Sequence, residues 1–188
     1  MIFKTDWGWV GVAATERGVR ALVLPKPTRR AVEHALHTVL NGNSKLTHPS
    51  GAPIALPNAM GHEGEGQGGG RSHAALHLRA ARAAISAYLE GRSRSFDLPL
   101  DLDGQPRFRV KVWQVLQSIP YGRVRSYGWV ARKVGKPRAA RAIGSACGAN
   151  PVPLLVPCHR VIAGDGSLGG FSGGLSSKKR LLKLEGAM

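Results

Sequence analysis

The chain has 188 residues, of which 43% are hydrophobic, so it can form one large domain or two small ones around a buried core. Its apolar runs are too short to cross a bilayer, and the first residues, MIFKTDWGWV, lack the charged and then apolar segments of a signal peptide. With only two cysteines, the composition favours a reduced, cytoplasmic chain over a disulfide-stabilised one.

The net charge of +16 is unevenly distributed. Residues 1–104 contain 12 Lys or Arg and 9 Asp or Glu, for a net charge of +3, whereas residues 105–188 contain 15 and 2, for a net charge of +13. A positive charge of this size attracts polyanions, and nucleic acid is the commonest of them. The alternative is a basic surface that serves only solubility. The segregation of the charge favours nucleic acid.

The first half of the chain predicts strands followed by two helices. The segments IFK, WGWVGVAAT and VRALVLP predict three strands, and TERG predicts a hairpin turn. A helix capped by Thr28 is expected over residues 28–40, and a mobile loop over the Gly-, Pro- and Asn-rich residues 41–71. The second helix, residues 73–90, ends at Gly91. Its apolar face consists of Leu78, Ala81, Ile85, Tyr88 and Leu89.

The segment SFDLPLDLDG predicts a short strand and a linker. We therefore place a boundary near Gly104, between a domain of residues 1–104 and a domain of residues 105–188. An apolar stripe from Phe108 to Ile119 predicts the first helix of the second domain.

Two short helices are expected next. Ser126 can cap the helix YGWVARKV, which Gly135 ends, and Pro137 suits the first turn of the helix PRAARAIGSAC. Two such helices, with Arg138 and Arg141 on the second, are typical of a helix-turn-helix. The small residues of the second helix allow close approach to a nucleic-acid groove or to a neighbouring helix, and both readings stay open.

The cysteine in PVPLLVPCHRVIAGDG is a candidate nucleophile. Cys158 directly precedes His159 and Arg160, and a base or a cation near a thiol lowers its pKa. The glycines between residues 164 and 174 leave room for a ligand near the backbone. The alternative is an inert core cysteine, because an apolar run precedes Cys158.

From Phe108 to Gly186 the chain resembles the O6-alkylguanine-DNA alkyltransferases, or methylated-DNA–protein-cysteine methyltransferases. The matching segments are FRVKVWQVLQSIPYGRVRSYGWVA, RAARAIGSACGANPVPLLVPCHRVI and GGFSGGLSSKKRLLKLEG. The pentapeptide PCHRV, with NPxP before it and LLKLEG after it, is a specific combination. The resemblance implies an α+β fold with two domains: an N-terminal small β-sheet with helices, ribonuclease-H-like, and a mostly helical C-terminal winged helix-turn-helix domain.

The resemblance also implies the chemistry. An alkyl group moves from guanine O6, or more weakly from thymine O4, to Cys158, once per protein molecule and without a cofactor. By motif position, His159 relays the thiol proton through water to Glu185, Tyr127 protonates the leaving guanine, and Asn150 links the recognition helix to the active-site strand. The residues alone also allow simpler interpretations: Glu185 as a solvated carboxylate at a helix end, Tyr127 as a half-buried helix residue, and Asn150 as an ordinary loop residue.

The contacts with substrate and DNA are implied in the same way. Val161 offers its carbonyl to the base, Ser172 donates to O6, Phe171 forms a wall where many members have tyrosine, and Cys147 packs at the side of the pocket. A base must be flipped out of a duplex to react, so the resemblance implies double-stranded DNA bound through the minor groove, with Arg141 filling the gap. The expected DNA-binding residues are Arg141, Arg138, Ala140, Ser126, Tyr127 and Arg160.

The sequence is compatible with two other classes of function. A damage sensor or DNA-binding regulator would use the same helix-turn-helix, but such sensors replace the acceptor cysteine, which is present here. A cysteine hydrolase would need an oxyanion motif and would leave the basic charge unexplained. The histidines of the pairs His34/His37 and His73/His77 have helical spacing, but a zinc site needs four ligands. We therefore expect no metal, no membrane contact and a monomer.

Overall fold

The computed structural model describes residues 1–42 and 72–188. The contacts divide the chain into two compact units, the first made of Met1–Ile85 and Leu98–Gly104, the second of Ser86–Asp97 and Gln105–Met188. Residues 86–97 thus group with the second unit, although they precede the predicted boundary near Gly104, which stays a prediction. Apart from its first two residues, the predicted loop at 41–71 lies outside the described residues.

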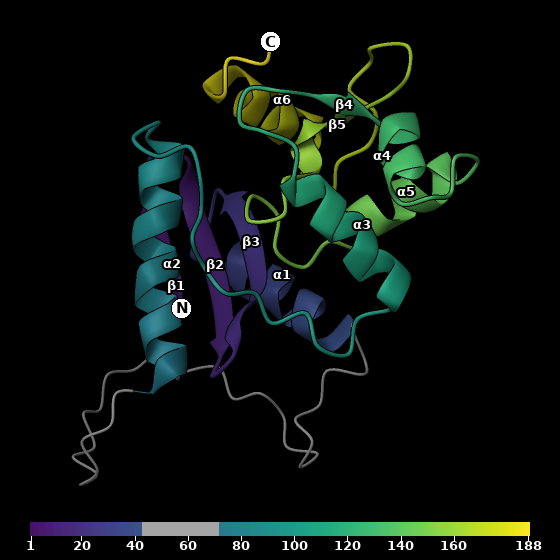
Figure 1. The fold of residues 1–188 in the computed structure, drawn as a ribbon. Coiled ribbons are helices and arrows are strands. Elements are labelled where there is room, and N and C mark those ends of the chain that lie inside the picture. The colour runs from purple at the N-terminus through teal and green to yellow at the C-terminus, as the bar shows by residue number, and fades with distance from the viewer. Residues whose placement is uncertain (43–71) are drawn as a thin grey trace, which may run out of the picture. The chain divides into compact units, whose positions relative to one another are not determined.

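The first unit contains a three-stranded antiparallel sheet in the order β1-β2-β3 (Figure 1). The strands are β1 (Ile2–Thr5), β2 (Gly8–Thr15) and β3 (Gly18–Lys26). Thr15 pairs with Gly18, so the hairpin turns at the predicted TERG segment. All three predicted strands are confirmed.

Helix α1 (Arg29–Gly42) packs against β2 and β3 (Figure 1). The Thr28 hydroxyl accepts a hydrogen bond from the Ala31 N–H at 3.2 Å, which confirms the predicted cap. The core between helix and sheet contains Ala13, Ala21, Val23, Val32, Leu36 and Leu40. Helix α2 (His73–Leu89) confirms the second predicted helix.

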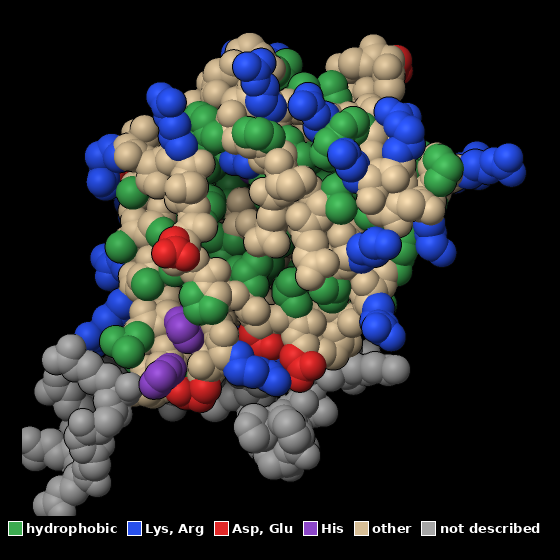
Figure 2. All heavy atoms as spheres, viewed as in Figure 1, with side chains coloured by type: hydrophobic (Ala, Val, Ile, Leu, Met, Phe, Trp, Pro, Cys, Tyr) green, Lys and Arg blue, Asp and Glu red, His purple; other side chains and the backbone are tan. Residues whose placement is uncertain are grey.

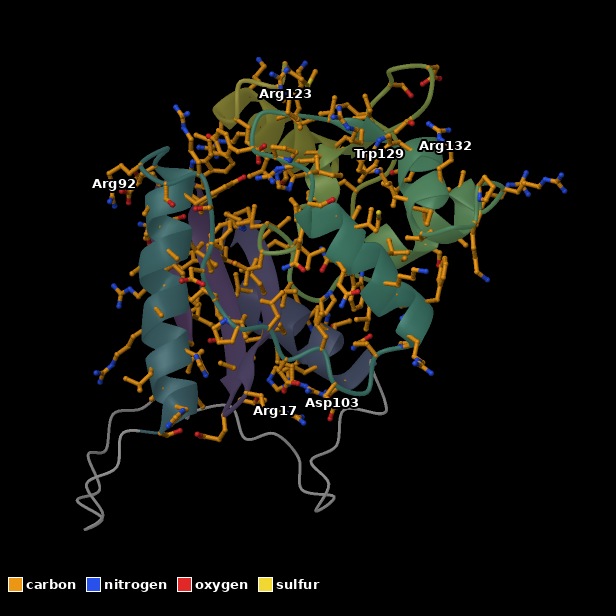
Figure 3. All side chains as sticks on the ribbon, viewed as in Figure 1. Arg17, Arg92, Asp103, Arg123, Trp129 and Arg132 are labelled. Carbon is orange, nitrogen blue, oxygen red and sulfur yellow. The ribbon has the colours of Figure 1, made fainter. Side chains whose placement is uncertain are left out.

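The strand expected in SFDLPLDLDG is reduced to a single bridge between Val19 and Leu100. Proline has no N–H to continue a ladder, but the Pro99 carbonyl accepts from the Val19 N–H at 2.8 Å. Asp101, which follows, is buried and forms an ion pair with Arg20 at 2.7 Å. Figure 3 shows Arg17 and Asp103 close together nearby, at an ion-pair distance of 2.9 Å. These charges hold the segment to the sheet of the first unit.

The second unit contains four α-helices, a 3₁₀-helix and two paired short strands (Figure 1). The helices are α3 (Arg107–Gln117), α4 (Tyr127–Lys133), α5 (Ala140–Gly148), η1 (Cys158–Arg160) and α6 (Leu175–Leu184). The Ser126 hydroxyl accepts from the Trp129 N–H at 3.1 Å, as expected of the α4 cap. The start of α5 differs from the prediction: Pro137 precedes the helix, because Lys136–Ala139 form a turn closed by a 2.9 Å bond.

Helices α3, α4 and α5 pack on one another. The fully buried Trp113 of α3 donates its indole N–H to the carbonyl of Ala146 on α5 at 2.9 Å. Strands β4 (Arg125–Ser126) and β5 (Val161–Ile162) pair in parallel, which the sequence did not predict. This pairing joins the start of α4 to the segment that follows Cys158.

The fold is therefore mixed α+β, as expected. Among residues 1–42 and 72–188, none of the helices is both long and apolar enough to cross a membrane.

Candidate active site

Cys158 begins the 3₁₀-helix η1 and is 3% exposed. Asn150 positions it through three contacts. Its side-chain amide donates to the Cys158 sulfur at 3.2 Å and to the Val156 carbonyl at 2.8 Å, while its Oδ1 accepts from the Val152 N–H at 3.1 Å. A buried asparagine with all of these bonds fixes the loop between α5 and η1, and its predicted role as the link between the recognition helix and the active-site strand stays a prediction.

A buried carboxylate lies at the end of α6. Glu185 Oε1 accepts from His159 Nε2 at 2.5 Å and from the Tyr88 hydroxyl. Its Oε2 accepts from Arg160 Nε at 2.9 Å and from the Gly122 N–H at 3.0 Å. Gly122 has φ +72°, and a Cβ there would lie 2.8 Å from the Glu185 carbonyl oxygen, so only glycine fits.

Burial alone would raise the pKa of Glu185, but the hydrogen bonds from His159, Arg160 and Tyr88 lower it to about 2. The carboxylate is therefore ionised and can only accept, so His159 carries its proton on Nε2. Burial lowers the pKa of His159, with the charges of Arg160 and Lys178 acting in the same direction against Glu185. The imidazole is thus neutral, and its buried Nδ1 has no hydrogen-bond partner among the described residues.

The pKa of the Cys158 thiol differs from the prediction. Burial raises the pKa of the thiol, and the opposing effects of the Asn150 hydrogen bond and the Lys178 charge are smaller. The expected lowering of this pKa is therefore wrong for the resting protein. The thiol is protonated at rest, and a base must remove its proton before the sulfur can attack.

A pocket of about 460 Å³ opens onto the thiol. Its lining residues come from α4, α5, η1 and the segment before α6, and are Tyr127, Ala140, Arg141, Gly144, Cys147, Gly148, Cys158, Gly170, Phe171 and Ser172. This volume is within the usual range for small-molecule sites. The pocket thus brings together most of the residues that the sequence assigned to the substrate.

Tyr127 is the first residue of α4 and is half-buried in this pocket. Its hydroxyl donates to the Gly170 carbonyl at 3.3 Å, and burial raises its pKa, as do the nearby thiols. The phenol therefore keeps its proton at neutral pH. Cys147 is also a free thiol, and burial raises its pKa to about 12, so it is a poor nucleophile.

Val161 does not belong to the described lining of the pocket. Its carbonyl accepts from the buried Lys178 Nζ at 2.5 Å, and the same ammonium also donates to the carbonyls of Leu168 and Gly170. Sequence reasoning missed this lysine, which ties one wall of the pocket to α6. A carbonyl can accept two hydrogen bonds, so the bond expected between Val161 and the base stays a prediction.

The exposed face of the second unit is strongly basic. Of its acids in residues 105–188, Glu185 is buried and Asp165 is exposed, whereas most of the Lys and Arg side chains are exposed. Figure 2 shows that blue side chains far outnumber red ones on the face in view. Arg125 of β4 and Lys133 of α4 lie over the Trp129 ring at 5.4 and 5.6 Å, and Arg132 projects from α4 (Figure 3).

The predicted DNA contacts fall into two groups. Ala140 and Arg141 lie in the first turn of α5 at the mouth of the pocket, and Arg138 is exposed just before it. Arg160, in contrast, is 7% exposed and is bound to Glu185 and, at 2.6 Å, to the Ile119 carbonyl. We therefore correct the DNA contact expected of Arg160: this guanidinium holds the buried carboxylate.

No group of three potential metal ligands occurs in the part of the chain that the structure describes. Of the two histidine pairs, His73 and His77 lie at the start of α2 with their ring centroids 6.5 Å apart.

Comparison with known proteins gave matches in both sequence and structure. The family model described as 6-O-methylguanine DNA methyltransferase, DNA binding domain, matches residues 107–187. The methylated-DNA–protein-cysteine methyltransferase of Mycolicibacterium paratuberculosis is 52% identical over 101 residues, 54% of this chain and 61% of the relative. The chain thus spans about three-fifths of that relative's length.

The protein of the same name from Methanosarcina acetivorans is 46% identical over 110 residues, 58% of this chain and 70% of the relative. Among solved structures, Mycobacterium tuberculosis OGT in complex with DNA aligns with a TM-score of 0.69 at 29% identity. That alignment covers 99% of this chain and 91% of the other. The similarity in fold therefore extends over both units.

Proposed function

Because this chain belongs to the methylated-DNA–protein-cysteine methyltransferase family, we propose that it repairs DNA by moving an alkyl group from O6-alkylguanine to Cys158. O4-alkylthymine is the weaker substrate. One observation carries the proposal: the Cys158 thiol and the exposed Arg141 line the same pocket, which has the volume to hold a purine. A sensor without transfer chemistry would not need a thiol at that place.

The reaction begins with loss of the thiol proton. Cys158 passes it through a water molecule to Nδ1 of His159, and Glu185 stabilises the imidazolium from the other side at 2.5 Å. The sulfur then attacks the alkyl carbon, the S–C bond forms and the C–O6 bond breaks. Asn150, which donates to the sulfur at 3.2 Å, favours the thiolate.

The leaving guanine takes a proton from the Tyr127 hydroxyl, and Tyr127 recovers one from the imidazolium through solvent. The thiol proton thus ends on guanine, and the charges balance without a cofactor. The product is a thioether, which is a poor leaving group, so each chain reacts once. Ser172 and Phe171, both in the pocket lining, hold the base by donating to O6 and by stacking.

The DNA binds to α4 and α5, which act as the helix-turn-helix of a winged domain. Arg138, Ala140 and Ser126 contact the duplex, the small residues of α5 allow entry into the minor groove, and Arg141 replaces the flipped base. The first unit is the ribonuclease-H-like domain of the family. We propose a monomer acting in the cytoplasm, where both free thiols stay reduced.

The test is incubation with a duplex that contains O6-methylguanine, followed by digestion and mass spectrometry of the peptides. We expect one methyl group on the peptide of Cys158, at most one per chain, and none with Cys158→Ala. Cys147→Ala is the matched control, because this pocket thiol should be dispensable. Tight binding of a lesion that stays intact would instead support the sensor, and methyl transfer to Cys147 would contradict the assignment of the acceptor.

A further inference from the structure

We propose that Tyr88 is a positioning residue that shares Glu185 Oε1 with His159 and so keeps the imidazole neutral and able to accept the thiol proton. The inference deepens the proposed function and rests on it for its biological role. Tyr88 lies in the last turn of α2, seventy residues before the cysteine, and was predicted only as part of the apolar face of that helix.

The position of Tyr88 is fixed by packing. The side chain is fully buried, and its ring lies 4.7 Å from the Phe96 ring and 5.9 Å from the Tyr121 ring, measured between centroids. Its hydroxyl donates to Glu185 Oε1 and lies 3.4 Å from His159 Nε2. The phenol, the carboxylate and the imidazole therefore meet at one point.

The phenol of Tyr88 uses its proton in the hydrogen bond to the Glu185 carboxylate. Burial, followed by the charge of Glu185, raises the pKa of Tyr88, so the hydroxyl stays neutral and acts as a donor. The Tyr88 hydroxyl is a further donor on Oε1, beside His159 and Arg160, and it reduces the negative charge that this oxygen directs at His159. An opposite charge close to a histidine favours the protonated form. Without the Tyr88 donor, the carboxylate would therefore raise the pKa of His159 and reduce the share of neutral imidazole that can accept a proton.

The other charges around His159 do not replace this effect. Burial lowers the pKa of His159 most, Glu185 raises it, and the charges of Arg160 and Lys178 lower it further. Arg160 donates to Oε2 at 2.9 Å and, through Nε and Nη2, to Oε1 at 3.2 Å, so its guanidinium is shared between both oxygens and its bonds to Oε1 are longer than that of Tyr88. Among the described residues, Tyr88 is the neutral donor that lies beside both Oε1 and Nε2.

The test compares Tyr88→Phe with Tyr121→Phe. The first change removes the shared donor but keeps the ring. The second removes the hydroxyl oxygen of a neighbouring tyrosine. That hydroxyl donates to the Leu184 carbonyl at 2.9 Å and not to Glu185. NMR titration of the ring nitrogens of His159 then gives its pKa in each protein without DNA.

We expect Tyr88→Phe to move the His159 midpoint to higher pH by about one unit, the shift that corresponds to a hydrogen bond to a charged group. Tyr121→Phe should leave the midpoint unchanged. The acid limb of the methyl-transfer rate should move by the same amount, which gives a several-fold loss near pH 6 and little loss at pH 8. Unchanged midpoints, or a loss of rate that is equal at every pH, would overturn the inference.

Two further outcomes keep the test decisive. If Tyr88→Phe does not fold, the wild-type spectrum still decides: His159 must be neutral at pH 7 with its proton on Nε2, and an imidazolium there would overturn the inference. If the wild-type protein transfers no methyl group, the proposed function fails, yet the NMR midpoints still measure the effect of Tyr88 on His159.

Discussion

The second unit uses arginine in two opposite ways. Arg160 is buried and has its guanidinium on the Glu185 carboxylate and the Ile119 carbonyl. Arg141 is exposed at the start of α5, at the mouth of the pocket. Arg160 directly follows Cys158 and His159, whereas Arg141 precedes them on α5, and only Arg141 is exposed to a ligand.

The buried and the exposed arginines should respond differently to substitution and to salt. A buried charge pair is little screened by salt, and removing one partner leaves the other uncompensated. The buried group around Glu185 should therefore respond to substitution with large, salt-independent losses. Exposed cations act through phosphate contacts that salt weakens, so the outer face should respond with small, graded losses.

Glu185→Gln is expected to have the largest effect. The amide cannot neutralise Arg160 and gives His159 a weaker acceptor, so methyl transfer should fall roughly a hundredfold or more, as when the acid of a catalytic triad is neutralised. The free energy of unfolding should fall by about 3 kcal/mol, since a buried charge loses its partner. Single-turnover kinetics and denaturant unfolding measure the two effects. A loss below tenfold would place Glu185 outside the proton relay.

The pH dependence of stability gives a control for the same residue. The folded pKa of Glu185 is about 2, against 4.5 ordinarily, so its contribution is fully present above pH 4.5 and is lost as the pH falls toward 2. The wild type should lose about 3 kcal/mol over this interval from Glu185. The Gln variant should lack this part of the acid destabilisation. If the free energy of unfolding fell equally with pH in both proteins, a pKa near 2 for Glu185 would be contradicted.

Arg141→Ala tests the outer region at the point where it meets the pocket. Unstacking a base costs a few kcal/mol, so loss of the residue that replaces it should slow repair of duplex DNA roughly ten- to a hundredfold. Reaction with a free alkylguanine base should stay within about twofold, because that substrate needs no flipping. The matched control is Arg138→Ala, which removes an exposed arginine just before α5 that does not line the pocket. Equal losses on duplex and free base would remove this role from Arg141.

The sequence predicted the elements that depend on local patterns. The apolar stripes gave the helices and the Thr28 and Ser126 caps, because these signals lie within a few residues. The start of α5 was placed too early, since Pro137 is compatible with a helix start and equally with the turn that the structure has. The β4–β5 pairing joins segments 36 residues apart and has no local signal.

The candidate site was predicted only in part, for the same reason. Arg160 was assigned to DNA because its charge was counted without knowledge of its partner, Glu185. A signal for the buried charges was present: Lys178 and Glu185 occupy the same face of α6 as the buried Leu181 and Leu182, at spacings of three and four residues. Charged residues on an apolar face must have buried partners. Likewise, a buried tyrosine needs a partner for its hydroxyl, which Tyr88 finds in Glu185.

The smallest effects are expected from the two cations that lie over the Trp129 ring, Arg125 of β4, just before α4, and Lys133 at the end of α4. Each alanine variant should weaken duplex binding only a few-fold near physiological salt, because one phosphate contact of several is lost. The slope of log Kd against log salt should fall by about 0.9 for each cation removed, a change that fluorescence anisotropy across a salt series can measure. Arg92 is the matched control, since it is already paired with Glu90. A reduced slope with Arg92→Ala, or an unchanged slope with both the Arg125 and the Lys133 variant, would mean that the DNA follows a different face of the unit, and that the contrast between Arg160 and Arg141 does not extend to the surface around Trp129.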